Sequence, residues 1–557
     1  MAGILRGLGV SPGVAVGPAV IVSDQAPTLP NEPAPSDVAA ELARVDAALE
    51  AVAGGFDARA AVAPLSARPI LEASAMMARD PGLRTSIEAK LAAGIGAAHS
   101  VTAAFDEFAA MLLGLGGYMA ERATDLADVR DRTASRLLGL PEPGLPQLTE
   151  PSIVVARDLA PAETVGLNPK TCLAIVTEAG GPTSHTAILA NQLGIPAVVR
   201  VPGAIALAPA TILAVDGSTG EVVADPDAET VAALDDRRRR RTAALGAVGP
   251  GATADQRPVP LLANIGTPED AARAGVQPVG GSGLFRTEFL FLDRETAPTL
   301  EEQAGIYRQV FEAFGQRRVV VRTLDAGADK PLRFADLGPE ENPALGRRGL
   351  RLAMERPDLL DTQLRALNLA REATGADVWV MAPMVSTAAE AAWFADRARS
   401  AGLPKAGVMI EVPSAAIRAR QILAEVDFAS LGTNDLSQYT FAADRMQGGL
   451  ATLLSPWQGA LLDLVASAAE AGSQLGKSVG VCGEAAGDPL AALALVGLGV
   501  TSLSMALGKV PGVRTALSLH TFQQCRELAQ AARSADSAET ARAAALALAD
   551  PLLADIL

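Results

Sequence analysis

Cysteine, histidine and aromatic residues are scarce in this sequence of 557 residues. The three cysteines, Cys172, Cys482 and Cys525, lie far apart and are odd in number, so they form neither a disulfide framework nor a CxxC zinc site. Basic residues are fewer than acidic ones, 47 against 63, and the formal net charge is −16. That balance argues against a general nucleic-acid binder, whose phosphate contacts need a basic surface. We therefore expect a protein of a reducing compartment that binds no nucleic acid.

The sequence also lacks a convincing signal peptide or membrane span. Its first residues carry one basic side chain, and glycines and prolines interrupt their apolar run. The longest uncharged stretch, between Asp488 and Lys509, is split by Gly497 and Gly499. A buried helix that continues into a buried strand explains this stretch better than a bilayer span. We therefore expect a cytoplasmic protein without membrane contact.

Breaker residues and apolar patterns divide the chain into four parts. Glycine-punctuated strands in 1–22 and alternating short strands and helices in 145–225 predict one small α/β domain. The alanine-rich helical segment 36–143 would then be an insertion into that domain. Residues 226–257 are typical of an exposed linker helix followed by a Gly/Pro-rich stretch. The five-arginine run 237–241 in this linker is interpreted as a solvated helix face in preference to a nucleic-acid patch.

The remaining part, 258–557, contains eight strand-like apolar runs that alternate with helical segments. Eight β/α units of this total length predict a TIM-type (β/α)8 barrel, so the fold class is α/β. An open Rossmann-type sheet is the alternative architecture. It would need a GxGxxG turn between its first strand and the following helix, and the sequence has none in that setting.

The motif GGPTSH (180–185) lies between a predicted strand and a predicted helix. A helix start offers free backbone N–H groups and a positive dipole end, and glycines allow a phosphate to approach closely. His185 is placed where its imidazole could attack phosphorus and hold the phosphoryl group covalently. The alternative is a histidine that only caps the helix. The other two histidines, His99 and His520, have no comparable context.

Polar residues follow several predicted barrel strands at their carboxyl ends, where barrel enzymes keep their active sites. Arginine forks bind phosphate and carboxylate groups, and Glu411 and Asp435 are oxygen ligands suited to Mg²⁺ shared with a phosphate. Singly, each of these residues could equally belong to a structural ion pair. No P-loop accompanies them, because GSQLGKS (472–478) is one residue too short and follows a helix. The residues are Arg286, Arg322, Glu411, Asn434, Asp435, Arg445 and Cys482.

Eight motifs, in this order, carry a resemblance to a known family: GVSPGVAVG, GGPTSHTAILA, GLFRTEFLF, RTLDAGADK, NPALGRRGLR, IEVPSA, GTNDLSQYTFAADR and VCGEAAGD. The chain resembles the phosphoenolpyruvate–protein phosphotransferases, the enzyme I family of the bacterial sugar phosphotransferase system, over essentially its whole length. The motif GGxTSH alone would also fit pyruvate phosphate dikinases and phosphoenolpyruvate synthases. Those enzymes carry a large nucleotide-binding domain for which this chain has no room. A non-catalytic regulatory paralogue is the other alternative, although the catalytic positions are all present.

The resemblance implies a role for each matching residue. His185 would carry the phosphoryl group, Cys482 would protonate the enolate carbon to give pyruvate, and Glu411 and Asp435 would hold Mg²⁺. Thr164 matches a threonine thought to orient the imidazole. The implied ligands of phosphoenolpyruvate are Arg286, Arg322, Asn434, Asp435 and Arg445, with Lys330 and Arg348 in matching motifs as further candidates.

The resemblance also implies partners. The insertion 36–143 resembles the docking domain for HPr, the small phosphocarrier protein, and family members form homodimers through the barrel. The first step of sugar import, from phosphoenolpyruvate to a histidine and then to HPr, is the implied function. Pro182 departs from the family pattern, since many members have an arginine there. It fixes the local backbone and removes a possible partner for the phosphate.

Overall fold

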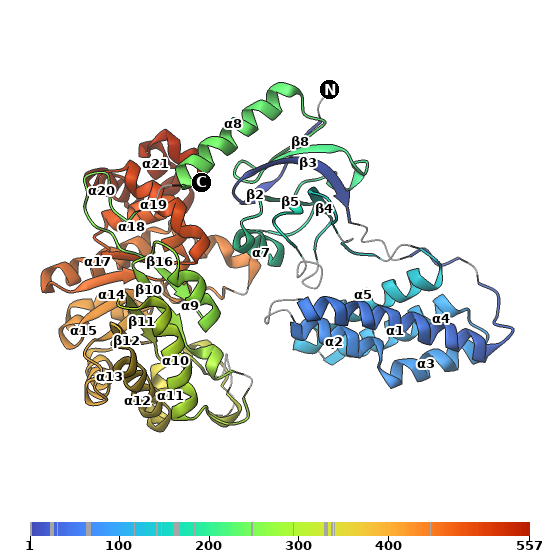
Figure 1. The fold of residues 1–557 in the computed structure, drawn as a ribbon, viewed down its shortest axis with the longest axis horizontal. Helices are drawn as coiled ribbons and strands as arrows, with labels where there is room; N and C mark the ends of the chain where they lie inside the picture. The colour runs from blue at the N-terminus through green and yellow to red at the C-terminus, as the bar shows by residue number, and fades with distance from the viewer. Residues whose placement is uncertain are drawn as a thin grey trace. The chain divides into compact units, whose positions relative to one another are not determined.

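A computed structural model shows that the chain forms two compact units, Met1–Arg238 and Arg239–Leu557 (Figure 1). Within the first unit lie a mixed sheet and a helical bundle, and within the second lies a barrel. The structure describes residues 3–22, 27–30, 32–62, 68–115, 117–140, 143–145, 148–159, 167–181, 184–246, 249–292, 294–327, 332–335, 338, 340–445 and 447–557.

The first unit is built on an eight-stranded sheet with the order β1-β8-β7-β3-β4-β5-β6-β2. Strand β3 pairs with β7 on one side and with β4 on the other, so strands before and after the helical segment share one sheet. This arrangement confirms the predicted α/β fold with an inserted helical bundle. The strands are β1 Gly3–Arg6, β2 Leu8–Ser11, β3 Val14–Ile21, β4 Ser152–Ala156, β5 Cys172–Thr177, β6 Ala197–Val199, β7 Ile212–Asp216 and β8 Glu221–Ala224.

The insertion is a bundle of alanine-rich helices around an apolar core that includes Phe56, Leu71, Ile87 and Phe105. Pro81 begins α3 behind the N-cap Asp80, whose carboxylate accepts hydrogen bonds from the next free backbone N–H groups. The helices are α1 Val38–Val62, α2 Arg68–Ala78, α3 Pro81–Ala92, α4 Ala97–Leu115 and α5 Gly117–Leu137.

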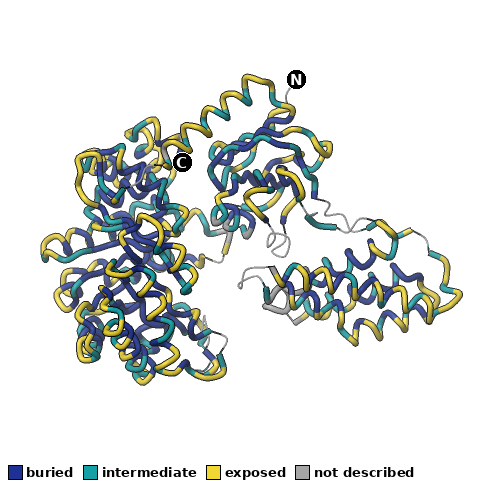
Figure 2. The backbone as a smooth tube through the Cα atoms, viewed as in Figure 1, coloured by how far each residue is buried: buried dark blue, intermediate teal, exposed yellow. Residues whose placement is uncertain are grey.

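Helix α8, Ala228–Leu245, contains the five-arginine run and crosses the boundary between the units. Arg237 forms an ion pair with Asp216 of β7, and Arg238 lies 2.8 Å from Asp235. Arg241 donates to the backbone carbonyl of Ile556 at 3.2 Å. Much of α8 is exposed (Figure 2), so the run is a solvated helix face with specific partners inside the protein.

The second unit is a closed barrel of eight parallel strands in which β16 pairs with β9, as the sequence predicts. The predicted buried helix and strand between Asp488 and Lys509 are α18 (Pro489–Gly497) and β16 (Ser502–Met505), and α18 is buried over nearly its whole length. No helix in the described ranges is long and apolar enough to cross a membrane. The strands are β9 Leu261–Ile265, β10 Gly281–Arg286, β11 Arg318–Arg322, β12 Val378–Ala382, β13 Ala406–Ile410, β14 Phe428–Leu431, β15 Ser478–Val481 and β16 Ser502–Met505.

Helices surround the barrel and bury a continuous apolar layer against the outer face of its strands. Several begin at a Thr or Ser capping box, including those at Thr267, Thr299 and Thr387. The helices are α9 Pro268–Gly275, α10 Leu300–Phe314, α11 Leu350–Glu355, α12 Pro357–Thr374, α13 Ala388–Ser400, α14 Pro413–Ile417, α15 Ala419–Glu425, α16 Thr433–Phe441, α17 Gly459–Leu475, α18 Pro489–Gly497, α19 Val510–Leu519, α20 Phe522–Arg533 and α21 Ala538–Leu548.

Candidate active site

The barrel places the predicted polar residues at the carboxyl ends of its strands. Arg286 and Arg322 are the last residues of β10 and β11, and Glu411 directly follows β13. Asn434 and Asp435 lie in the first turn of α16, immediately after β14, and Cys482 directly follows β15. Because the carboxyl ends of parallel strands converge in a closed barrel, these residues share one mouth.

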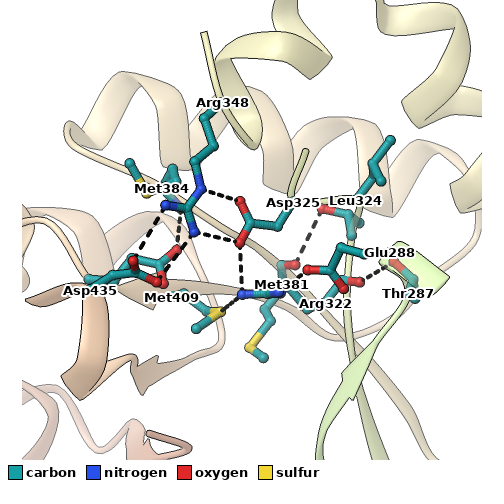
Figure 3. Close-up of polar contacts among 12 residues, drawn as sticks. Thr287, Glu288, Arg322, Leu324, Asp325, Arg348, Met381, Met384, Met409 and Asp435 are labelled. Atoms are coloured by element: carbon teal, nitrogen blue, oxygen red, sulfur yellow. Dashed lines mark hydrogen bonds and ion pairs between the residues drawn. The ribbon is translucent and has the colours of Figure 1, made fainter. Parts of the chain in front are cut away.

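A buried network of charges fills the floor of this mouth (Figure 3). Asp325, with 0% of its surface exposed, accepts hydrogen bonds from Nε and Nη2 of Arg348 at 2.9 and 3.0 Å. The same carboxylate lies 3.0 Å from Nη1 of Arg322. Arg322 also forms an ion pair with Glu288. Asp325 therefore connects the two buried guanidinium groups and fixes their orientation.

The opposite side of Arg348 contacts Asp435. Its Nη1 and Nη2 atoms lie 3.4 and 3.3 Å from the two carboxylate oxygens, and Nη1 lies 3.3 Å from the hydroxyl of Tyr439. Arg348 is itself only 2% exposed. The arginine that the resemblance offered as a further candidate is thus a central member of the buried network.

Glu411 is fully buried beside this network. Its Oε1 accepts a hydrogen bond of 2.7 Å from the backbone N–H of Met384, a non-glycine residue with φ of 58°. Among the described residues, no hydrogen-bond partner reaches its buried Oε2. Desolvation, reinforced by repulsion from Asp435 and Asp325, raises the pKa of Glu411 to about 8. The strained backbone at Met384 therefore holds a carboxylate whose charge is only partly compensated.

The donor set fits a divalent cation that is completed by substrate oxygens. Three carboxylates (Glu288, Asp325, Asp435) face two guanidinium groups (Arg322, Arg348), and a cation would be needed to hold Glu411 in its charged form as well. In the described part of the chain, no group of three or more His, Cys, Asp or Glu side chains is arranged to hold a metal by itself. Magnesium commonly uses one or two carboxylates together with substrate phosphates, so the unpartnered Glu411 oxygen and Asp435 suit it.

Gly432 keeps this donor set open. A Cβ atom at this position would lie 2.8 Å from Oε2 of Glu411 and 2.9 Å from the methyl carbon of Met409. Any larger residue would therefore press on the carboxylate. The glycine that precedes Asn434 and Asp435 leaves room beside Glu411 for an ion or a substrate oxygen.

Arg286 and Arg445 are exposed at the mouth, above the buried network. Surrounding protein atoms lower the pKa of Arg286 by desolvation, and repulsion from Arg322 and Arg445 adds to that effect, while Glu484 opposes it. The side chain is reached by water and yet crowded by protein, as expected in a concave opening. Positive charge that is incompletely balanced at an open mouth favours an anionic ligand.

Asn434 is oriented by a reciprocal contact with Glu484. Its Nδ2 donates to the Glu484 carboxylate at 3.3 Å, and its Oδ1 accepts from the backbone N–H of Glu484 at 3.0 Å. These two contacts fix the orientation of the amide, and its second N–H, which has no partner in the described part of the chain, can donate to a ligand. Asn434 can therefore contribute a donor to an anion at the mouth.

Cys482 is a buried, protonated thiol. Only 2% of the residue is exposed, and burial raises its pKa to about 11, while a hydrogen bond with Ser430 opposes the rise. Its backbone N–H and its thiol both contact the carbonyl of Leu431, at 3.1 and 3.7 Å. At neutral pH the thiol therefore keeps its proton and can act as an acid.

His185 is the first residue of α7, His185–Leu193, which follows β5 in the first unit as predicted. The hydroxyl of the N-cap Ser184 accepts from the N–H of Ala187 at 3.3 Å. Gly180, with φ of 89°, turns the chain ahead of the helix. Thr164, Pro182 and Lys330 lie outside the described residues, so their predicted roles remain predictions.

Arg200 places a guanidinium beside this turn. It follows β6, the neighbour of β5 in the sheet, and its Nε donates to the carbonyl of Gly180 at 3.0 Å. Its Nη2 lies 3.5 Å from the position that a Cβ of Gly181 would occupy. Sequence reasoning missed this residue, since it lies 20 positions from Gly180 and only the pairing of the two strands brings them together.

Other residues of the site were also missed. Glu288 and Asp325 lie in the motifs GLFRTEFLF and RTLDAGADK. Their closeness in sequence to Arg286 and Arg322 was the one feature that could have marked them as site residues. Glu484 lies in VCGEAAGD, two residues after Cys482. The identity of their partners could not be derived from these positions.

Comparison with known proteins gives the class that this fold and site define, the phosphoenolpyruvate-utilising enzymes. Family models described as the N-terminal, mobile and PEP-binding domains of PEP-utilising enzymes match residues 6–122, 148–220 and 241–521.

Individual relatives identify the family within this class. A phosphoenolpyruvate-protein phosphotransferase of Streptomyces coelicolor is 54% identical over 98% of this chain and 99% of its own length. Proteins of the same name are 40% identical in Haloferax volcanii, covering 84% of this chain and 85% of the relative, and 35% identical in Bacillus subtilis, covering 96% and 98%. The chain belongs to the phosphoenolpyruvate-protein phosphotransferase family.

Proposed function

We propose that this chain transfers the phosphoryl group of phosphoenolpyruvate to its own His185 and then to the carrier protein HPr, with release of pyruvate. The observation that carries the proposal is the buried network at the barrel mouth. It combines two oriented guanidinium groups with an unpartnered carboxylate oxygen and a protonated thiol. Family membership supports the same reaction.

In this proposal the exposed arginines and the buried network contact different parts of the path by which the substrate enters. Arg286 and Arg445 meet the anion at the mouth, and Arg322, held by Glu288 and Asp325, receives it at the floor. Asn434 offers its free amide N–H. Asp435, Arg348 and Lys330 complete the proposed set of substrate-binding residues. Fixed donors of this kind bind a phosphate without reorganising when charge develops on it.

Glu411 and Asp435 are the proposed Mg²⁺ ligands. When bound, the ion would supply positive charge to the phosphoryl oxygens and to the enolate that forms as the phosphoryl group leaves. The protein's own contribution is to keep the Glu411 carboxylate in place through the Met384 N–H and to leave space beside it at Gly432.

The proposed reaction breaks the bond between the phosphorus and the enol oxygen of the substrate and forms a bond between phosphorus and an imidazole nitrogen of His185. The electron pair of the broken bond stays on the enol oxygen, and the resulting enolate takes a proton at carbon from the thiol of Cys482 to give pyruvate. The thiol suits this step because it is protonated at neutral pH. Thr164 is the proposed residue that orients the imidazole.

The remaining parts of the proposal concern partners. Residues 36–143 would dock HPr, residues 1–22 with 145–225 would carry the phosphohistidine, 226–257 would link the parts, and 258–557 would bind the substrate and form a cytoplasmic homodimer. The resemblance of the motifs supports these assignments.

Radiolabelled phosphoenolpyruvate tests the proposal directly. With Mg²⁺ the wild-type chain should take up one phosphoryl label per chain and pass it to HPr, whereas His185→Ala should take up none. His99→Ala is a matched control, because it removes another histidine at the start of a helix, α4. Stoichiometric labelling of folded His185→Ala, or labelling that requires ATP in place of phosphoenolpyruvate, would contradict the proposal.

A further inference from the structure

A polar path runs through the interior of the barrel beneath Cys482. On β14, Phe428 packs inside the barrel with Cys482, whereas Ala429 and Leu431 belong to the apolar layer between strands and helices. Because side chains alternate along a strand, Ser430 also faces the interior. TIM-barrel interiors are ordinarily filled with branched apolar side chains, so a buried serine one layer below the proposed acid calls for an explanation.

The space around Ser430 is a cavity of about 20 Å³, which is enough for one water molecule. Glycines create it: Gly480 is the register partner of Ser430 on β15, and Gly283 faces Ser504. The polar part of its lining consists of Arg318, Ser430, Ser478, Ser502 and Ser504. The cavity therefore offers the several hydrogen-bonding partners that a buried water requires.

The lining leads to the outside at the amino ends of the strands. Arg318, Ser478 and Ser502 are the first residues of β11, β15 and β16, and all three are only half-buried. Ser430 and Ser504 lie deeper and are buried. The polar side chains thus extend from the amino-terminal end of the barrel, where they reach solvent, toward the mouth at its carboxyl-terminal end.

The upper end of the path meets Cys482 in two ways. Ser430 lies diagonally below the thiol on the neighbouring strand, because its register partner Gly480 precedes Cys482 by two residues, and its hydroxyl lowers the pKa of the thiol. Separately, Ser504 donates to Oδ1 of Asn264 at 2.6 Å, and Nδ2 of Asn264 donates to the carbonyl of Cys482 at 3.0 Å. The second contact fixes the backbone of Cys482, and the first reaches its reactive atom.

We propose that Ser430 and a water in this cavity resupply the proton of Cys482 from the amino-terminal side of the barrel. The inference rests on the proposed function, in which the Cys482 S–H gives its proton to the enolate carbon and is left as a thiolate. The Ser430 O–H then donates its proton to sulfur while its oxygen takes one from the cavity water, and solvent at the rim restores that water. The net result is one proton moved from solvent to the thiolate, and every intermediate group regains its starting state.

Such a route has a physical reason. Cys482 is 98% buried, so water at the mouth has little access to its sulfur. A proton supply from below leaves the substrate site free of bulk water, which would otherwise compete for the phosphoryl group and the enolate. Ser430 is accordingly a positioning and relay residue that does not touch the substrate.

Quenched-flow measurement of pyruvate with phosphoenolpyruvate, Mg²⁺ and excess HPr separates the two proton steps. In Ser430→Ala the first equivalent of pyruvate per chain should form at nearly the wild-type rate, because Cys482 starts protonated. Later equivalents should form about 100-fold more slowly, the scale of a lost proton-transfer group. The same burst and slow phase are expected for Gly480→Ala, because its added methyl would lie 2.5 Å from the Ser502 hydroxyl and would displace this part of the cavity lining.

Ser282→Ala is the matched control, because it deletes a buried hydroxyl from β10 of the same barrel that does not line this cavity. It should show no slow phase. Wild-type steady-state turnover in Ser430→Ala and Gly480→Ala would refute the relay, and so would equal slowing of the first and later equivalents. Failure of the wild-type chain to form labelled phosphohistidine, or a normal first equivalent in Cys482→Ala, would instead overturn the proposed function.

Discussion

Replacing Asp325 with asparagine should lower the free energy of unfolding of the barrel more than the same replacement at an exposed aspartate. Asp325 is fully buried and is the one carboxylate in Figure 3 that contacts both Arg348, at 2.9 and 3.0 Å, and Arg322, at 3.0 Å. Asparagine has nearly the same shape but carries no charge, and one of its two polar atoms becomes a donor. In Asp325→Asn one guanidinium therefore faces an NH₂ group in place of an oxygen.

The size of the effect follows from burial. Removing one partner of a buried ion pair costs about 3–5 kcal/mol, because the other charge stays buried and uncompensated. Asparagine keeps one acceptor, and loss of the Asp325 charge relieves repulsion on Glu411, so the lower end of this range is expected. We predict that Asp325→Asn lowers the free energy of unfolding of the barrel by about 3 kcal/mol.

Tryptophan fluorescence during urea unfolding measures this quantity selectively, because all three tryptophans, Trp379, Trp393 and Trp457, lie in the second unit. With an m-value of about 3 kcal/mol per M, the midpoint should fall by about 1 M urea. Asp361→Asn is the control, since Asp361 meets Arg397 at 2.6 Å with side chains 49% and 33% exposed. That pair should contribute at most about 1 kcal/mol. Equal midpoint shifts in the two variants would refute the reasoning.

Four further predictions address the proposed reaction. Cys482→Ala should bind phosphoenolpyruvate normally by calorimetry but lose most pyruvate formation; wild-type turnover in this variant would show that the thiol only packs in the barrel and is not the acid. Because the Glu411 pKa is raised to about 8, protons compete with Mg²⁺ below that pH, so affinity should increase with pH by up to about tenfold per unit. Glu411→Gln should abolish that dependence, and an unchanged slope would contradict it. Arg200→Ala should shorten the lifetime of the phosphorylated chain at least about threefold; the exposed Arg6→Ala, on the same sheet, should not. A fragment ending at Arg241 should accept phosphate from phospho-HPr but not from phosphoenolpyruvate, and direct labelling at the full-length rate would exclude separate sites.

The barrel could be predicted because its signals are local. Each strand is a short apolar run bounded by polar or breaker residues, and the uncharged stretch after Asp488 separates into α18 and β16 at its glycines. The placement of Arg286, Arg322 and Cys482 followed from the same reasoning, since a residue that ends a barrel strand must face the mouth.

The partners of these residues could not be predicted in the same way. Arg348 meets Asp325 from 23 positions further along the chain, and it meets Asp435 from 87 positions away. Contacts between residues so far apart in the sequence depend on the tertiary fold of the barrel, which no local pattern specifies. Ser430 was not identified for a related reason. Within the run VDFASLG it resembles an ordinary strand residue, and the cavity beside it exists because its partner on the next strand, Gly480, has no side chain.

The proposed reaction joins two sites that belong to separate units of the chain. His185 lies in Met1–Arg238, and every proposed ligand of phosphoenolpyruvate lies in Arg239–Leu557. An in-line transfer needs phosphorus and nitrogen within about 3–3.5 Å, so the reaction requires the two units to meet, and delivery to HPr requires His185 to leave the barrel mouth again. Helix α8 connects them, with Arg237 bound to Asp216 in the first unit and Arg241 bound to the Ile556 carbonyl in the second. Because these arginines fix neighbouring turns of one helix to different units, the movement must be absorbed in the turn of α8 between them, or the Arg241 contact must break. The arginine run is therefore better understood as a pair of anchors for the linker than as a binding surface.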